Sequence, residues 1–419
     1  METPGTPEQT GLDPTAPEAT ASEALPVGPV LPILFGSNGA AAAAPFSFGV
    51  THPPDVTTTV FDPDGELRLD IGPYSLPVLS CVVCPRTISR ASNVFKRMLY
   101  GGFSESKPKE GEWVVKLPED DPDAMTFVLY ILHGHFDKVP RTLTQDKLYR
   151  VTVVTDKYDL TSSLRPWASM WLQNPEAPES RNMLANAQRI RIAWELGDTE
   201  LFKYEANDIL RHAPEELFKS TSLEAPGVDI LESLGLVEPM KKARVPAITA
   251  LLDPVKELLD SLFGVVVYNS AERPRQCKVW KNSHLVNETH ACDAMVLTSA
   301  LNSLHTRELY PLPEPASVNS TIRQLYKRLD AAAKSITPLQ TRPWRRVGSA
   351  RSNCRNNCTE HSPCEKCCEE SSDHSQCSPG PELQSALAKA YNSPAVVLEE
   401  WHTAHLDAQA AKTRLPVSD

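Results

Sequence analysis

Two segments of this 419-residue chain carry its strongest structural signals: Leu67-Arg68-Leu69-Asp70-Ile71, and residues 117–160, which read LPEDDPDAMTFVLYILHGHFDKVPRTLTQDKLYRVTVVTDKYDL. The apolar alternation in the first segment predicts a strand with one buried face. In the second segment, Asp121 and Thr144 are N-cap residues that begin two helices, and Pro122 takes a first helical position. The combination indicates an α+β domain.

The segments 56–60 and 67–71 flank the turn 62–65, and this arrangement predicts a β-hairpin. Residues 78–83 form a third expected strand and residues 113–117 a fourth.

Helices are expected between and after these strands. A short helix covers Ile88 to Ala91, and Ser92 caps the next one, which ends at Gly101-Gly102. After Tyr158, a further helix should begin near Ser163 and carry four apolar residues, namely Leu164, Trp167, Ala168 and Trp171.

Several short sequence motifs of this region resemble those of the BTB/POZ domain in the form common among filamentous fungi. They are SRASNVFKRML at 89–99, GGFSES at 101–106, LPEDDPDA at 117–124, DKYDL at 156–160 and RPWA at 165–168. RIRIAWELGDTELF at 189–202 and CDAMVLTSALNSL at 292–304 extend the resemblance to about two thirds of the chain. It implies a small sheet flanked by helical hairpins that binds other proteins and often pairs with itself.

In that family the first helices of two copies commonly meet. The resemblance therefore implies an interface at Ile88, Phe95, Met98 and Leu99. The alternative is that these side chains belong to the core, which for any one of the last three is favoured by roughly three to one. The chain departs from many family members at Cys84, where they have His, and at Asn93, where they have Pro.

Composition divides the chain into five regions. Residues 1–55 lack Lys and Arg and are rich in Pro and Ala, which predicts disorder. The BTB/POZ domain should occupy 56–175 and an all-helical domain 178–335. Residues 336–380 form a polar, Cys-rich and flexible segment, and 381–419 a single helix to about His402 with a disordered end.

Six of the ten cysteines lie in the Cys-rich segment: Cys354, Cys358, Cys364, Cys367, Cys368 and Cys377. Cys364 and Cys367 form a C-x-x-C pair of the kind that binds zinc. The candidate ligands of a structural zinc are Cys358, Cys364, Cys367 and Cys377, and the alternative is a reduced, flexible tail.

Other thiols give weaker signals. The pair Cys81 and Cys84 lies in a strand, where residues three apart point to opposite faces, so it is interpreted as core. Cys277 and Cys292 match no zinc spacing and stay unassigned. We expect no other cofactor.

The net charge and the missing sequence motifs disfavour several classes of function. A net charge of −11 disfavours a nucleic-acid partner, and no apolar run is long enough to cross a membrane. The N-terminal residues lack the pattern of a secretory signal, so we expect a soluble protein of the cytoplasm or nucleus. Nucleotide-binding, hydrolase and metalloprotease motifs are missing from the sequence, which predicts a protein that is not an enzyme.

The sequence therefore predicts a protein interaction adaptor that acts by homo- or hetero-oligomerisation. One alternative is a substrate receptor of a cullin-type ubiquitin ligase, with the helices at 181–210 extending the surface that binds the cullin scaffold. The other alternative is a zinc-containing chromatin or transcription regulator in which residues 342–351 and the Cys cluster contact DNA.

Overall fold

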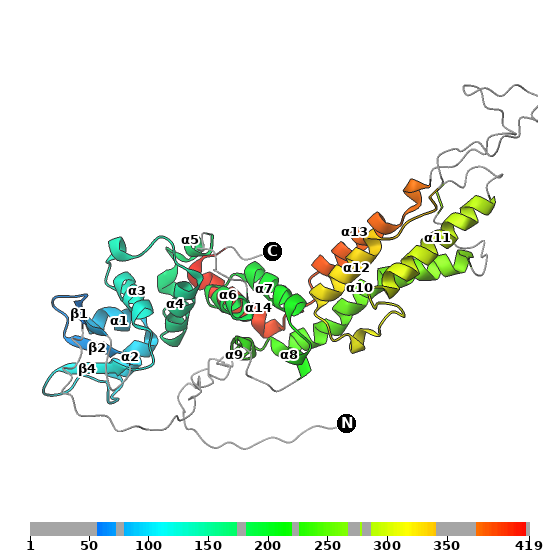
Figure 1. Ribbon diagram of the computed structural model, residues 1–419. Helices are drawn as coiled ribbons and strands as arrows, with labels where there is room; N and C mark the ends of the chain where they lie inside the picture. Colours follow the sequence, from blue (N-terminus) through cyan, green and yellow to red (C-terminus); the bar gives the residue numbers. More distant parts are fainter. Residues whose placement is uncertain are drawn as a thin grey trace, which may run out of the picture. The chain divides into compact units, whose positions relative to one another are not determined.

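The computed structural model describes residues 57–72, 79–173, 182–219, 226–266, 277–278, 286–340 and 374–415. These residues are mainly helical and include one small mixed sheet (Figure 1). The expected disordered tail at 1–55 and most of the Cys-rich segment lie outside them. Among the described residues, no helix combines the length and the apolar content that a membrane span needs.

The sheet has four strands, β1 (Thr57–Val60), β2 (Leu67–Ile71), β3 (Leu79–Val83) and β4 (Trp113–Leu117), in the spatial order β1-β3-β2-β4. Strand β2 pairs antiparallel with β3 on one side and parallel with β4 on the other. Leu67, Leu69 and Ile71 of β2 are completely buried. The apolar face of β2 thus belongs to the core of the α/β unit, as its alternation predicted.

The predicted hairpin is wrong in one respect, because β1 and β2 are not neighbours. Strand β1 pairs parallel with β3, which lies between them. The connection is held by Val82, whose carbonyl accepts the N–H groups of Phe61 and Asp62 at 2.9 and 3.3 Å. Alternation identifies a strand but not its partner, and the exposed Val60 shows that this strand does not bury its apolar residues as a core strand would.

Five helices complete the α/β unit: α1 (Pro85–Ala91), α2 (Asn93–Tyr100), α3 (Pro122–Leu132), α4 (Gln145–Lys157) and α5 (Ala168–Gln173). The predicted N-caps are confirmed: Ser92, Asp121 and Thr144 each accept a backbone N–H from the third residue after them. The expected single helix from Ser163 is instead a 3-10 turn, η2 (Thr161–Leu164), followed by α5. Pro166 lies between them and lacks the N–H that a continuous helix would need.

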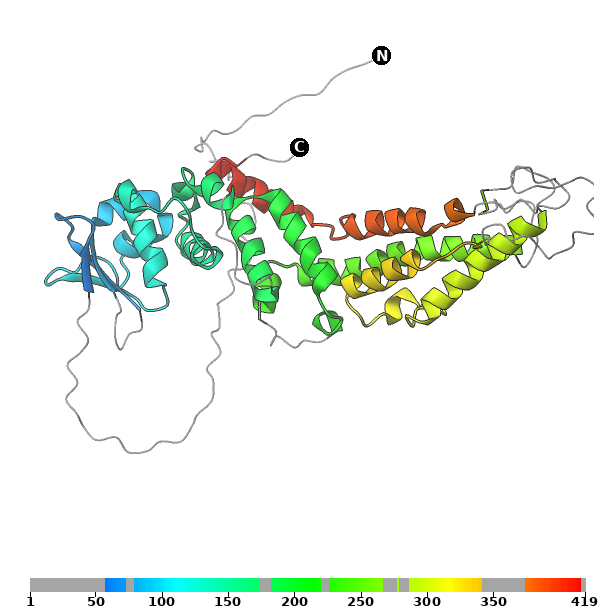
Figure 2. The same cartoon turned by 45° about the horizontal axis from the view of Figure 1, so that its top comes forward.

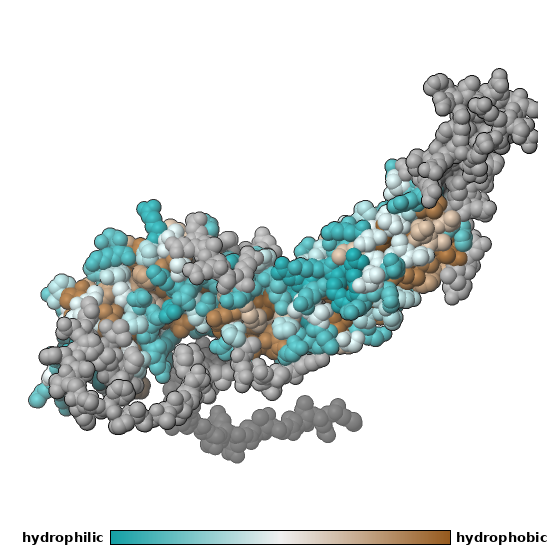
Figure 3. Space-filling model, in the orientation of Figure 1, coloured by the Kyte–Doolittle hydropathy of each residue, from teal (hydrophilic) through white to brown (hydrophobic). Residues whose placement is uncertain are grey.

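The all-helical region is confirmed. It contains α6 (Met183–Leu196), α7 (Thr199–His212), α8 (Glu216–Lys219), α9 (Val228–Ser233), α10 (Val237–Val266), α11 (Val286–His305), α12 (Ile322–Lys334), α13 (Gly380–Asn392) and α14 (Glu400–Thr413). Its apolar stripes form one continuous core. Helices α10 to α13 run side by side (Figure 2), and hydrophilic residues cover most of the face of this bundle drawn in Figure 3.

The C-terminal prediction requires correction. Residues 381–415 form two helices rather than one helix and a disordered end, and both pack on the preceding region. Helix α13 packs on α10 and α12, and α14 lies against α6 in both ribbon views. The residues between the helices, including Ser393 and Pro394, break the helical pattern, and Leu406 and Ala410 of α14 are buried. The polar composition of α14 concealed a narrow apolar stripe.

Gly197 allows α14 to approach α6. It ends α6 in the left-handed conformation, at φ 79°. A Cβ atom there would overlap the backbone of Gln409 and Ala410. Thr413 closes the contact by donating a hydrogen bond to the Leu196 carbonyl at 2.7 Å. The absence of a side chain at this position is thus what permits the close packing.

A buried carboxyl group lies beside this contact. Glu195 of α6 is completely buried and accepts hydrogen bonds from the hydroxyl of Thr161 and, at 3.2 Å, from the amide of Gln409. Burial is the main cause that raises the pKa of Glu195 to about 8, with Asp156 adding to the effect. Among the described residues, Oε1 of Gln409 is buried without a hydrogen-bond partner.

We predict that Gly197→Ala detaches α14. The substitution forces an unfavourable φ, at about 1 kcal/mol, and adds an overlap with the backbone of α14. Limited proteolysis should then cleave within 394–415 faster than in the wild type. Gly102→Ala is the control, because its φ is also positive but its added Cβ would contact nothing. Equal cleavage rates in the two variants would contradict this role of Gly197.

We also predict a pH effect of Glu195. Because its folded pKa lies above the unfolded value of about 4.5, the folded state holds a proton that the unfolded state has lost. Stability should therefore fall as pH rises from about 6.5 to 8, by about 1 to 2 kcal/mol. In Glu195→Gln this component should vanish, as measured by urea denaturation at several pH values. Identical slopes in the two proteins would exclude the effect.

Candidate partner-binding surface

Helix α2 has one buried and one exposed face. Phe95 and Leu99 are completely buried, whereas Asn93, Lys96, Arg97 and Tyr100, spaced three and four residues apart, are exposed. Val94 lies at the edge of this exposed stripe. The helix therefore presents a continuous surface that the α/β unit itself does not cover.

Tyr158, at the end of α4, anchors the buried face. The rings of Phe95 and Tyr158 stack with centroids 4.2 Å apart. Ser92 donates its hydroxyl to the Tyr158 carbonyl and accepts the N–H of Phe95, so one side chain both caps α2 and ties it to α4. The Tyr158 hydroxyl in turn donates to Asp120, which also pairs with Lys157 at 2.7 Å. Burial, followed by the negative charge of Asp120, raises the pKa of Tyr158, so the phenol stays protonated.

These contacts join residues from three of the sequence motifs named above. Ser92 and Phe95 come from residues 89–99, Asp120 from 117–124 and Tyr158 from 156–160. In the structure they form one cluster, which we call the α2 anchor: Ser92, Phe95, Asp120 and Tyr158. The anchor fixes the orientation of α2 relative to α4 and hence the residues that α2 exposes.

The loop after α2 is also held in place. The indole N–H of Trp113 donates to the Glu105 carbonyl at 2.8 Å, and the N–H of Gly102 donates to the Ser106 hydroxyl at 3.1 Å. The Phe103 ring turns back over Gly101, where a Cβ atom would lie 2.9 Å from it. Phe103 is therefore positioned close to the end of α2 even though 61% of its surface is exposed.

The resulting surface is apolar and basic. We define the α2 surface as Val94, Lys96, Arg97, Tyr100 and Phe103. Its three apolar members are 39%, 52% and 61% exposed. Residues 85–100 contain Arg86 and Arg90 as further cations and no acidic residue, and no described residue forms an ion pair with any of these four cations. In a chain of net charge −11, this is a locally positive surface.

The predicted interface residues do not form this surface. Ile88, Phe95 and Leu99 are completely buried, so they belong to the core, and only Met98 is half-buried at the edge. The correction has a simple cause: apolar spacing on a helix identifies the face that turns inward, while the face left accessible to a partner is the opposite one. The helical position of Tyr100, a large side chain on the side away from Phe95, was the signal that could have identified it, with Val94 at the edge of the same stripe.

Of the predicted zinc ligands, Cys358, Cys364 and Cys367 lie outside the described residues. The fourth, Cys377, is buried beside Cys277, Cys292 and His374, together with a partly buried Leu339. Cys377 thus does not belong to an exposed tail. Two thiols that the sequence left unassigned are its neighbours.

One predicted core thiol and two imidazoles lie at the sheet. Cys81 is completely buried, as predicted, and burial raises its pKa to about 12. His133, at the end of α3, accepts the Cys84 N–H at 3.2 Å, and burial lowers its pKa. His135 bonds to the Phe61 carbonyl at 2.8 Å. These imidazoles join α3 to the sheet, and a neutral His133 contributes as a hydrogen-bond acceptor.

Two small cavities lie among the described helices. The one among α10 to α13 and the one beside Asn207 and Tyr391 have volumes of about 10 Å³ each. This is the space of about one water molecule. The exposed, pre-positioned α2 surface is therefore the better candidate for a function.

Comparison of the chain with protein-family models, with curated proteins and with solved structures finds no match.

We predict that substitutions on the buried and exposed faces of α2 have clearly different effects on the free energy of unfolding. Phe95→Ala removes a buried ring and should lower the free energy of unfolding by about 3 to 5 kcal/mol. Val94→Ser, on the exposed face of the same helix, should change it by less than about 0.5 kcal/mol. Chemical denaturation measures both. A tolerated Phe95→Ala would contradict the anchor.

Proposed function

We propose that this protein is an interaction adaptor of the BTB/POZ type and that its α/β unit pairs with a second copy of the chain. The order of the elements from β2 to α5 supports this proposal: a strand pair, a helical hairpin, a strand parallel to β2 and three further α-helices with two 3-10 turns between them. The sequence motifs whose residues form the α2 anchor also support the proposal.

The observation that carries the proposal is the α2 surface. Tyr100 packs edge-on against Trp113, with ring centroids 6.0 Å apart, and so has already lost much of its conformational freedom. A partner that covers Val94, Tyr100 and Phe103 would bury apolar area at a low entropic cost, which favours binding. Aromatic and arginine side chains are also the commonest energetic centres of protein interfaces.

The charges indicate how two copies would meet. Direct pairing of one α2 with another would place Lys96 and Arg97 opposite the same cations, which is unfavourable. The rest of the chain is acidic, with a net charge of −11. In a two-fold dimer, the α2 surface of each copy can instead contact an acidic surface of the other, and the contact then occurs twice. Electrostatic attraction should therefore contribute to assembly.

We predict that the wild-type chain is a dimer by light scattering at micromolar concentration and low salt. The double variant Lys96→Glu/Arg97→Glu should weaken the dimer at least about tenfold, and Tyr100→Ala should weaken it similarly. Raising the salt from about 0.05 M to about 0.5 M should shift the wild type toward monomer.

Matched controls are present in the helical region. Tyr204 is 52% exposed, as Tyr100 is, and Lys256 is an exposed lysine of α10. Tyr204→Ala and Lys256→Glu should leave the dimer intact, and thermal denaturation should show that all variants are folded. A wild-type chain that stays monomeric at every concentration would refute self-pairing, and equal weakening by the controls would refute this surface.

A further inference from the structure

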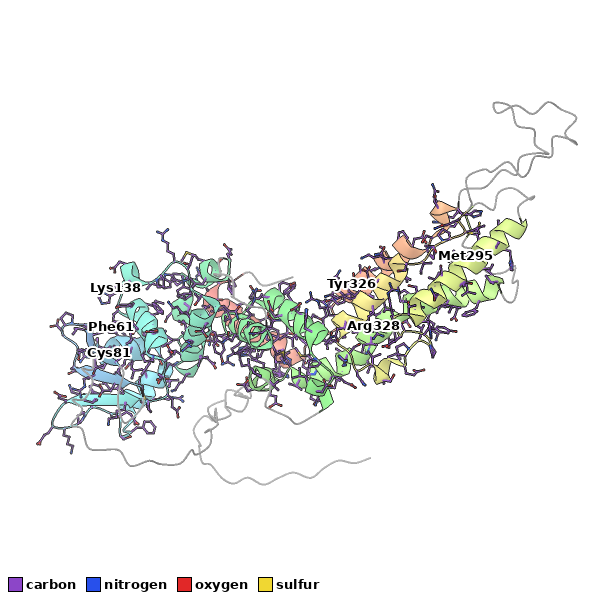
Figure 4. The ribbon with its side chains drawn as sticks, viewed as in Figure 1. Phe61, Cys81, Lys138, Met295, Tyr326 and Arg328 are labelled. Carbon is purple, nitrogen blue, oxygen red and sulfur yellow. The ribbon has the colours of Figure 1, made fainter. Side chains whose placement is uncertain are left out.

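Four side chains with metal-binding atoms meet at one end of the helical bundle. They are Cys277, Cys292 of α11, and His374 and Cys377, which flank and end the short 3-10 turn η5 (Ser375–Cys377). Their exposed fractions are 4%, 0%, 1% and 1%. One ligand atom from each lies within 4.8 Å of all the others. Met295, labelled in Figure 4, marks the turn of α11 that follows Cys292.

The distances fit a tetrahedral zinc ion. With Zn–S bonds of about 2.3 Å and Zn–N bonds of about 2.0 Å, a tetrahedron separates two sulfurs by about 3.8 Å and a sulfur from a nitrogen by about 3.5 Å. Sγ of Cys277 lies 4.0 Å from Sγ of Cys377 and 3.4 Å from Nδ1 of His374. Nδ1 of His374 lies 3.8 Å from Sγ of Cys377.

Neither a disulfide nor the packing of reduced thiols accounts for this cluster. A disulfide needs sulfurs about 2.05 Å apart, whereas those of Cys277 and Cys377 are 4.0 Å apart. Core packing is a common reason for buried cysteines, but it does not explain an imidazole buried among three of them, because burying a polar ring has a cost. The cluster is also separate from the main apolar core of the bundle.

Backbone N–H groups near the cluster donate hydrogen bonds to a cysteine sulfur and to a neighbouring carboxylate, as they do around metal-bound thiolates. The N–H of Lys278 donates to Sγ of Cys377 at 3.2 Å. The N–H of Cys277 donates to the buried carboxylate of Asp293, next to Cys292, at 2.8 Å, which fixes the approach of the Cys277 segment to α11. Such contacts orient ligands and stabilise their charge.

We propose that Cys277, Cys292, His374 and Cys377 bind one Zn²⁺ ion in a structural site. The four protein ligands leave no position for water, so the ion joins chain segments and performs no hydrolysis. It ties the residues before α11 and those before α13 to α11 itself. Binding breaks three S–H bonds, and the protons pass to the buffer while the imidazole binds in its neutral form. This zinc site does not depend on the function proposed above.

The test is the metal content of the full-length chain, purified under reducing conditions and measured by mass spectrometry. The wild type should contain at least one zinc per chain. The decisive variant replaces the five other clustered cysteines, Cys354, Cys358, Cys364, Cys367 and Cys368, by Ser, and it should keep one zinc. Cys81→Ala, which alters a buried thiol of the sheet labelled in Figure 4, should also keep it.

Substitutions in the site should remove the ion. In the background without the five other cysteines, Cys292→Ser and His374→Ala should contain less than about a tenth of the zinc, and His374→Cys should retain it because four ligands remain. Chelation should lower the melting temperature of that background by roughly 5 °C or more. A background that binds no zinc, or in which Cys292→Ser binds as much as its parent, would overturn the proposal.

A spectroscopic measurement covers the case in which a site variant does not fold. Co²⁺ added to the metal-free chain without the five other cysteines should produce the visible bands of tetrahedral cobalt and a sulfur-to-metal charge-transfer band of three thiolates, and Zn²⁺ should displace it. An octahedral spectrum without the charge-transfer band would contradict the site.

Discussion

The α2 anchor is the interaction on which the proposed function of the α/β unit depends. Ser92, Phe95, Asp120 and Tyr158 come from three chain segments, and together they fix α2 on the end of α4. Since the inward face of α2 is held this firmly, its outward face is fixed as well. The α2 surface, Val94, Lys96, Arg97, Tyr100 and Phe103, is thereby pre-positioned, and this is what the proposed binding role requires.

The helical region contains contacts between segments that are far apart in the sequence. Helix α14 packs on α6 because Gly197 has no side chain, and Glu195 lies buried beside this contact with hydrogen bonds to Thr161 and Gln409. At the other end of the bundle, Cys277, Cys292, His374 and Cys377 bring distant segments together. In both places polar or small residues lie where segments distant in the sequence meet.

Much of the fold could be predicted from the sequence because its signals are local. N-caps at Ser92, Asp121 and Thr144, the glycine that ends α6 and the alternation in β2 each act within a few residues. The strand that pairs with β1, the second C-terminal helix and the proposed zinc ligands could not be predicted. Each depends on residues far apart in the chain: Cys277 and Cys377 are separated by 100 positions, and no spacing rule covers such a pair.

The interface prediction failed for a different reason. Apolar periodicity in α2 correctly identified Phe95 and Leu99 as residues that share a face, but that face is the core. The most direct test of binding through the opposite face is hydroxyl-radical footprinting of the wild-type chain at concentrations below and above its assembly midpoint. Tyr100 and Phe103 should become less reactive on assembly, while Tyr204 should not change. Unchanged reactivity of Tyr100 and Phe103 in an assembled sample would contradict a binding role of the α2 surface.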